Sequence, residues 1–110
     1  MPKFTLMKDS ALRFGGLEFA TFRLRDGVDE SVLLEASEKV DRDFLANEEG
    51  ILGHVLLRGR DGVYADLALA DSQARAEEVC AQWTANAVAL KYIELLDEES
   101  VDITFWERIR

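Results

Sequence analysis

The sequence is short of several residue types on which whole classes of protein depend. It has one cysteine, Cys80, which excludes an intrachain disulfide, a cysteine-rich zinc site and a Cys-x-x-Cys redox pair. It has one proline and no Gly- or Ser-rich linker, so we expect a single domain among its 110 residues. Gly-x-Gly-x-x-Gly, Walker and Gly-x-Ser-x-Gly motifs are missing, which leaves nucleotide cofactors and serine hydrolysis without support.

Positive charge and long hydrophobic runs are scarce as well. Thirteen Lys and Arg stand against 22 Asp and Glu, and the formal net charge is -9. A surface this negative repels phosphate backbones and anionic lipid, so we expect neither nucleic acid nor a membrane as a partner. The longest apolar runs, 67–70 and 87–90, fall far short of a membrane span. Residues 1–7 lack the pattern of a signal peptide, so we expect a cytoplasmic location.

What the chain does contain is a regular succession of strand and helix patterns. Apolar residues at helical spacing predict one helix after Asp29 or Ser31 and a second after Asp71 or Ser72, which Asn86 would divide. The segment 59–62 (Gly-Arg-Asp-Gly) predicts a hairpin turn, because glycine supplies the positive φ that such turns need. Aromatic and alternating apolar residues predict four strands, at 17–25, 51–58, 63–69 and 101–108.

This order of elements predicts an α+β fold of the ferredoxin-like β-α-β-β-α-β type. Its sheet is antiparallel, and both helices lie on one face. We assign residues 17–110 to this domain and residues 1–16 to an N-terminal extension.

The two faces of the predicted sheet differ in polarity, and the large apolar residues on the more polar face predict that two subunits associate. The odd positions of 51–57 and 63–69 are all apolar or small, and we expect them to face the helices. The even positions are mixed, yet exposing the large apolar residues on that side would cost about 1.5–3 kcal/mol each. The extension 1–16 is too charged to cover them, so we expect a homodimer through this second face, a dimeric α+β barrel. The residues in question are Leu52, Leu56, Tyr64 and Trp106.

Polar residues on that second face predict either a self-satisfied network or a cavity. His54 is the only histidine, and it could act as a catalytic base or proton donor, with Asp66 as its partner. The simpler interpretation is a histidine hydrogen-bonded to Asp66 or Tyr64 without chemistry. One His and one Asp fall below the usual three or four ligands of a metal site, so we expect no metal and no cofactor.

Further residues could bind a small aromatic or apolar ligand. Arg23 could pair with a substrate carboxylate, although a salt bridge to Glu107 or Asp66 is the simpler interpretation. Tyr64 and Trp106 could stack on an aromatic ring or serve only as interface packing. Phe19 would wall the same pocket, and Thr104 would add a hydroxyl group. Cys80 lies on the apolar stripe of the second helix, where a lone cysteine is typically a small hydrophobe.

Three segments are similar to one known family. Residues 49–58 (EGILGHVLLR) resemble the second strand of the antibiotic-biosynthesis-monooxygenase-like group, 71–76 (DSQARA) resemble the start of its second helix, and 95–101 (LLDEESV) resemble its exit into the last strand. With the element order, the resemblance spans residues 17–108. It implies a ferredoxin-like protomer, dimerised through its sheets, with one cavity per subunit.

The resemblance implies no single activity. Some members oxidise aromatic polyketides with O₂ and neither metal nor flavin, some degrade haem, and many have no known activity. This chain departs from the pattern at the end of the third strand, where 67–70 (LALA) replaces a common tryptophan. It also has Cys80 near the place of a histidine that is common in the second helix. Both departures weaken haem degradation.

Three hypotheses follow for the function. The first is a cofactor-independent monooxygenase-like enzyme that acts on a small aromatic molecule inside a dimeric barrel. The second is a non-catalytic ligand-binding or stress-related barrel. The third is an assembly module whose interior is simply packed.

Overall fold

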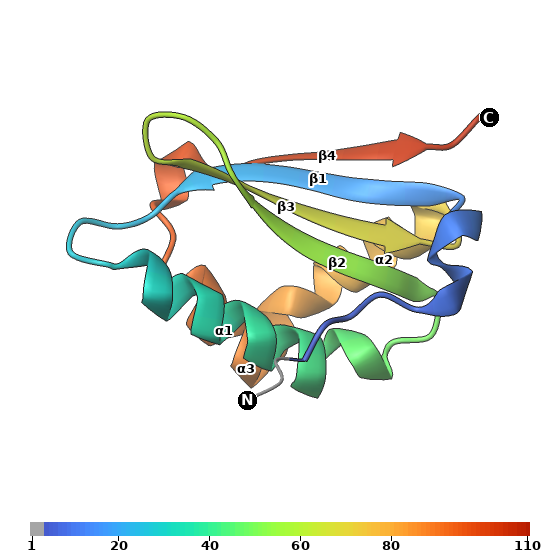
Figure 1. Ribbon diagram of the computed structural model, residues 1–110, viewed down its shortest axis with the longest axis horizontal. Helices are drawn as coiled ribbons and strands as arrows, with labels where there is room; N and C mark the ends of the chain where they lie inside the picture. The colour runs from blue at the N-terminus through green and yellow to red at the C-terminus, as the bar shows by residue number, and fades with distance from the viewer. Residues whose placement is uncertain (1–3) are drawn as a thin grey trace.

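The computed structural model describes residues 4–110 and confirms the predicted order of elements. Each predicted strand is present, and the second helical region is divided, as predicted (Figure 1). Of the extension 1–16, residues 1–3 lie outside the described residues. The principal elements are β1 (Gly16–Arg23), α1 (Glu30–Asp43), β2 (Ile51–Arg58), β3 (Val63–Ala70), α2 (Gln73–Gln82), α3 (Ala87–Ile93) and β4 (Asp102–Glu107).

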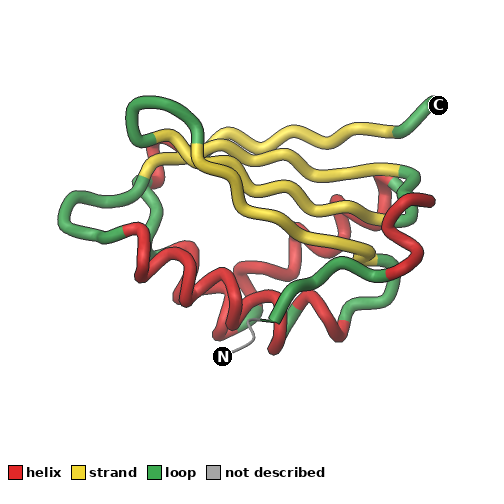
Figure 2. The backbone as a smooth tube through the Cα atoms, in the orientation of Figure 1, coloured by secondary structure: helices red, strands yellow, loops and turns green. Residues whose placement is uncertain are grey.

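The four strands form one antiparallel sheet in the order β2-β3-β1-β4. The three helices α1, α2 and α3 lie against one face of this sheet, and none of them covers the other face (Figures 1 and 2). This is the ferredoxin-like fold that the element order predicts. Among residues 4–110, no helix is both long and apolar enough to cross a membrane.

Local signals explain where several elements begin and end. In the hairpin between β2 and β3, Asp61 and Gly62 both have positive φ, 55° and 79°, which suits a tight connection between strands. The Ser72 side chain accepts a hydrogen bond from the Arg75 amide and begins α2. Asn86 accepts hydrogen bonds from two amides at the start of α3, and this cap divides the second helical region.

The described part of the N-terminal extension lies along the outer edge of the sheet. The backbone of Leu6 and Lys8 exchanges hydrogen bonds with His54 and Leu52 of β2. The Leu6 side chain is 4% exposed and belongs to the hydrophobic core. This segment therefore shields the edge strand β2, which would otherwise present unpaired backbone groups.

The predicted assignment of the two sheet faces was wrong. The even-numbered residues of β1 and β3, together with Ile51, His54 and Leu56 of β2, face the helices. The odd-numbered residues of β1 and β3, with Gly53, Val55 and Leu57 of β2, face away from the helices, although the odd-numbered residues of β2 and β3 are the apolar or small ones that we expected to face them. We call the first side the helix-covered face. The second is the open face, and its residues are Leu17, Phe19, Thr21, Arg23, Gly53, Val55, Leu57, Val63, Ala65, Leu67, Leu69, Asp102, Thr104 and Trp106.

A β-bulge near the start of β2 also interrupts the strict alternation of side chains between the two faces. Ile51 pairs with Ala70, yet Gly53 pairs with Leu69, so the register shifts by one residue between them. As a result Ile51 is 1% exposed and packs in the core beneath the sheet, while Gly53 lies on the open face. Both residues have odd numbers, so strict alternation would place them on the same face of the sheet. The bulge places them on opposite faces.

Candidate functional site

A half-enclosed cavity of about 180 Å³ lies between the helix-covered face and the segments α2 to α3. We call it the inner cavity. Its buried end carries Phe22 and Tyr92, and its exposed lining residues are Thr84 and Ile103, which mark the opening to solvent. The full set of lining residues is Glu18, Ala20, Phe22, Asp66, Cys80, Trp83, Thr84, Tyr92, Ile93, Leu96, Val101 and Ile103.

A chain of buried polar side chains reaches the wall of this cavity. His54 on β2 is hydrogen-bonded through Nδ1 to Asp41 of α1 and through Nε2 to Asp66 of β3. The second oxygen of Asp66 accepts a hydrogen bond of 2.7 Å from the Tyr92 hydroxyl. Asp66 and Tyr92 line the cavity, whereas His54 stands one hydrogen bond behind Asp66. We call Asp41, His54, Asp66 and Tyr92 the buried network.

The charge state of His54 follows from its two carboxylate partners. Burial by itself lowers the pKa of the imidazole, but the negative charge of Asp66 and hydrogen bonds to both carboxylates outweigh that effect and raise the pKa to about 10. His54 is therefore an imidazolium at neutral pH and donates both hydrogen bonds. In this state it cannot act as the catalytic base that its place in the sequence suggested.

Tyr92 stays protonated because its hydroxyl is buried beside a carboxylate. Burial, followed by the charge of Asp66, raises the pKa of this hydroxyl well above 10. The Tyr92 ring packs edge-on against Trp83 and Phe22, with ring centroids 5.4 and 6.1 Å apart. The hydroxyl is thus held in one direction by both packing and a hydrogen bond to Asp66.

A second carboxylate, Glu18 on β1, faces the same cavity. It is 7% exposed, and burial raises the pKa of its carboxyl above 4.5, an effect that a hydrogen bond with the Cys80 thiol partly offsets. Burial and the charge of Glu18 in turn raise the pKa of Cys80 to about 12. Cys80 is therefore a neutral thiol and a poor nucleophile at neutral pH.

Among the predicted site residues, the structure brings only His54 and Asp66 to this place. Tyr64 also lies on the helix-covered face, but at its far end, where its hydroxyl donates a 3.0 Å hydrogen bond to Glu30. Arg58 donates two further hydrogen bonds to the same carboxylate, and the contacts with Arg58 and Tyr64 lower the pKa of Glu30 to about 2. Tyr64 packs against Phe22 but is not part of the cavity lining.

The remaining predicted residues lie elsewhere. Arg23 donates a hydrogen bond to the Asp61 carbonyl in the hairpin turn, in place of the predicted salt bridge to Glu107 or Asp66. Phe19, Thr104 and Trp106 share the open face, where the Trp106 indole donates a 2.9 Å hydrogen bond to the Thr104 hydroxyl. The expected single pocket between two sheets, with His54 and Trp106 in it, is therefore not what one subunit builds.

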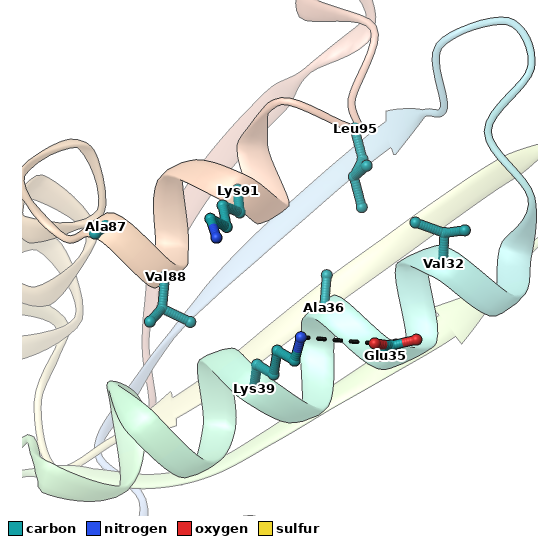
Figure 3. Close-up of a pocket in the computed structure, with 8 residues that line it drawn as sticks. All are labelled: Val32, Glu35, Ala36, Lys39, Ala87, Val88, Lys91 and Leu95. Carbon is teal, nitrogen blue, oxygen red and sulfur yellow. Dashed lines mark ion pairs between the residues drawn. The ribbon is translucent and has the colours of Figure 1, made fainter.

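A larger hollow of about 320 Å³ lies on the outer surface between α1 and α3, and Figure 3 shows its lining side chains. Its charged groups are solvated: Lys39 and Glu35, which pair at 3.5 Å, are 59% and 73% exposed. Its wall residue Val32 is 46% exposed. Its lining contains no aromatic side chain and no buried polar group, so the smaller inner cavity is the better candidate site.

Glu18, Asp41, Trp83 and Tyr92 were not predicted as site residues. Two of them carry a signal that could have been used. Glu18 interrupts the otherwise small or apolar positions 16, 20 and 22 of one strand face. Asp41 falls inside the apolar stripe of α1, next to Val40. Charged residues at core positions are expected to have partners or a function.

The described residues contain no group of three or more His, Cys, Asp and Glu side chains placed to hold a metal ion. His54 and its two aspartates are close together, but both ring nitrogens are already hydrogen-bonded to carboxylates.

No protein-family model and no curated protein matches the sequence, whereas solved structures match its fold. SnoaB, a cofactor-independent oxygenase from Streptomyces nogalater, is 17% identical with a TM-score of 0.65, over 87% of this chain and 95% of that one. A candidate antibiotic biosynthesis monooxygenase from Caulobacter crescentus is 22% identical with a TM-score of 0.60, over 92% and 97%. A dimeric ferredoxin-like protein from an uncultured marine organism is 11% identical with a TM-score of 0.58, over 91% and 92%. These likenesses confirm the predicted resemblance to the antibiotic-biosynthesis-monooxygenase-like group at the level of the fold.

Proposed function

We propose that this chain is an enzyme that oxidises a small electron-rich aromatic molecule with O₂, without a metal or organic cofactor, in the inner cavity. The observation that carries this proposal is the convergence of Glu18, Asp66 and Tyr92 on an otherwise apolar cavity. Small-molecule sites combine apolar walls with a few placed polar groups in this way. The fold that the chain shares with SnoaB supports the same class of chemistry.

The reaction needs a proton acceptor and a dry, apolar site. For the model compound 1-naphthol, a cavity carboxylate takes the hydroxyl proton, and the electron pair stays on the naphtholate. The ring carbon para to that oxygen reduces O₂ and forms a C–O bond. Cleavage of the O–O bond and loss of the ring proton then give 1,4-naphthoquinone and one water. One oxygen atom of O₂ enters the product and the other enters the water, so 1-naphthol is the only reductant.

The buried network has a positioning role in this proposal. His54, held as an imidazolium, fixes one oxygen of Asp66, and Tyr92 fixes the other. The Asp66 side of the cavity wall therefore keeps its orientation while the substrate changes from a neutral phenol to an anion and then to a neutral quinone. Polar groups that are fixed in advance stabilise developing charge without a cost of reorganisation.

The test is oxygen uptake with 1-naphthol, with ¹⁸O₂ to follow the oxygen atom into the quinone. A matched pair of variants assigns any activity to the inner cavity. Ala20→Leu places a larger side chain in the cavity wall, and Ala74→Leu makes the same change at an exposed position of α2. We expect incorporation of one ¹⁸O atom, a fall of at least tenfold in kcat/KM for Ala20→Leu and no change for Ala74→Leu.

Absence of oxygen uptake across electron-rich phenols contradicts the enzymatic proposal. If 1-naphthol then still raises the melting temperature of the wild type and not of Ala20→Leu, the alternative holds, a non-catalytic small-ligand-binding or stress-related protein. The cavity is the observation that favours this alternative over a simply packed interior.

We also infer that two copies pair through their open faces in solution. Leu57 and Trp106 on that face are 47% and 57% exposed, beside a row of half-buried apolar residues. An exposed apolar patch of this kind is typical of an interface. The described part of the N-terminal extension pairs with the edge of β2 and reaches this face beside Gly53, where the Met7 side chain lies, yet Leu57 and Trp106 stay exposed. The dimeric ferredoxin-like neighbour supports this arrangement. In this arrangement the assembly surface and the inner cavity lie on opposite sides of the sheet.

A further inference from the structure

The charged side chains that line the inner cavity are all of one sign. Its lining contains two carboxylates, Glu18 and Asp66, and neither Lys, Arg nor His. The cation of the buried network, His54, is already shared between Asp41 and Asp66. Arg23, a predicted partner for a substrate carboxylate, is bonded to the hairpin turn instead. An anionic ligand would therefore enter a negative, poorly solvated site without a partner.

The two cavity carboxylates differ in how many hydrogen-bonding positions they have left. Both oxygens of Asp66 are engaged, one by His54 and one by the Tyr92 hydroxyl. Within residues 4–110, the Glu18 carboxylate has a single side-chain hydrogen-bond partner, the Cys80 thiol. A thiol is a weak donor, while an ionised carboxylate can accept about four hydrogen bonds. Glu18 is therefore the cavity carboxylate that has hydrogen-bonding positions left for a ligand.

The volume of the cavity limits the size of a ligand that could supply this hydrogen-bond donor. Its volume is about 180 Å³. An engineered apolar cavity of about 150 Å³ binds benzene, so this space suits one or two fused rings and not a larger ring system. The rings of Phe22, Trp83 and Tyr92 provide a wall for such a flat molecule.

We propose that Glu18 is the specificity-determining residue of the inner cavity, which selects neutral one- or two-ring molecules bearing a hydroxyl group and excludes their carboxylate counterparts. The hydroxyl donates its hydrogen bond to the Glu18 carboxylate, which has few competing donors. This inference rests on the proposed function in that it takes the inner cavity as the ligand site. It also identifies which of the two carboxylates receives the substrate proton.

The test measures binding alone, so that it can fail or succeed apart from oxygen chemistry. The probes are 1-naphthol, 1-methoxynaphthalene, which lacks the hydroxyl proton, and 1-naphthoate, which carries the negative charge. The protein is the full chain with Trp106→Phe, which leaves Trp83 in the cavity wall as the one tryptophan and its fluorescence as the signal. We expect 1-naphthol to bind at least tenfold more tightly than either other probe.

Substitution of Glu18 should reverse this order. Glu18→Gln keeps the shape but removes the charge, so 1-naphthol should bind roughly three- to tenfold more weakly because a charge-assisted hydrogen bond is lost. In the same variant 1-naphthoate should bind at least threefold more tightly, since the repulsion from Glu18 is gone. Glu107→Gln, at an exposed position of β4, is the matched control and should change neither affinity.

Opposite changes for the two probes support the proposal, because a merely structural effect of Glu18→Gln would weaken both alike. Equal binding of all three probes to the wild type, parallel changes in the variant, or no binding of any probe overturns it. The comparison of 1-naphthol with 1-methoxynaphthalene needs no variant of Glu18 and decides the matter if Glu18→Gln does not fold. If the selectivity holds but no oxygen is consumed, only the oxygenase proposal fails.

Discussion

A sheet usually buries its apolar face under helices and exposes its polar face, and in this subunit the two faces differ from that pattern. The helix-covered face carries the charged residues Glu18, His54 and Asp66, all less than 10% exposed. The open face is mainly apolar apart from Arg23 and Asp102 at one end, and Trp106 on it is more than half exposed. In a single subunit three ionisable side chains of the sheet are thus buried, while large apolar side chains of the sheet are exposed.

Each face is explained by a different partner. The buried charges are stabilised because Asp41 of α1 and Tyr92 of α3 supply hydrogen-bonding groups from the helix layer. The open face has no such partner within the described part of the chain, and a second subunit would provide one. We therefore assign the proposed chemistry to the helix-covered face and the proposed assembly to the open face, and the following predictions test that division.

The largest expected effect comes from breaking the buried network. His54→Leu leaves Asp41 and Asp66 buried without a counter-charge, so the free energy of unfolding should fall by about 3–5 kcal/mol. Arg58→Leu, which breaks the exposed ion pair with Glu30, is the control and should change the free energy of unfolding far less, because solvent screens exposed charges. Urea unfolding at pH 7 measures both. Similar losses of unfolding free energy in the two variants would mean that the buried network contributes no more to stability than an exposed ion pair.

The next effect concerns the open face. Leu67→Glu places a charge at a half-buried position of that face, and desolvating this charge in the dimer should weaken association at least about a hundredfold. Sedimentation velocity measures the dissociation constant. Leu34→Glu, at an exposed position of α1, should leave it unchanged. A dimer that tolerates Leu67→Glu but is lost with Leu34→Glu would move the interface to the helices and break the comparison.

A smaller effect is the pH dependence of stability. The pKa of His54 is 6.5 in the unfolded reference and about 10 in the fold, so the imidazolium stabilises the native state fully below pH 6.5. This contribution should be lost as the pH rises toward the folded-state pKa, by about 1.4 kcal/mol per pH unit above 6.5. The slope should be absent in His54→Leu. A slope that is equal in the two proteins would contradict the charged state assigned to His54.

The smallest effect is expected at Cys80. Because burial and Glu18 keep its thiol neutral, Cys80→Ala should leave oxygen uptake within about threefold of the wild type, well under the hundredfold or more lost with an essential nucleophile. The variant should lose less than about 1.5 kcal/mol of stability, as for the removal of one weak hydrogen bond. Complete inactivation with unchanged stability would assign covalent chemistry to the thiol and redraw the site.

The sequence predicted the order of elements well, because each rests on local signals. The hairpin turn at Gly62 and the caps at Ser72 and Asn86 depend on neighbouring residues alone. It also predicted Asp66 or Tyr64 as the partner of His54, since all three lie at mixed positions of adjacent strands, and the structure shows Asp66.

The side of the sheet on which that pair lies could not be predicted in the same way. Alternation separates the two faces of a strand but does not say which of them the helices cover. Here the decisive groups, Asp41 and Tyr92, come from helices whose contacts are set only by the whole fold, and the bulge after Ile51 changes the alternation itself. The cavity could not be foreseen either, because it arises where the C-terminal ends of α2 and α3 lie over β1 and β4.

The two tryptophans offer the most direct test, because one lies on each side of the sheet. Trp83 lines the inner cavity, and Trp106 belongs to the open face. In a ¹⁵N-labelled sample titrated with 1-naphthol, we predict a saturating shift of the Trp83 indole N–H signal and none for Trp106. A saturating shift confined to Trp106 would place the ligand between the sheets and contradict the assignment of chemistry to the helix-covered face.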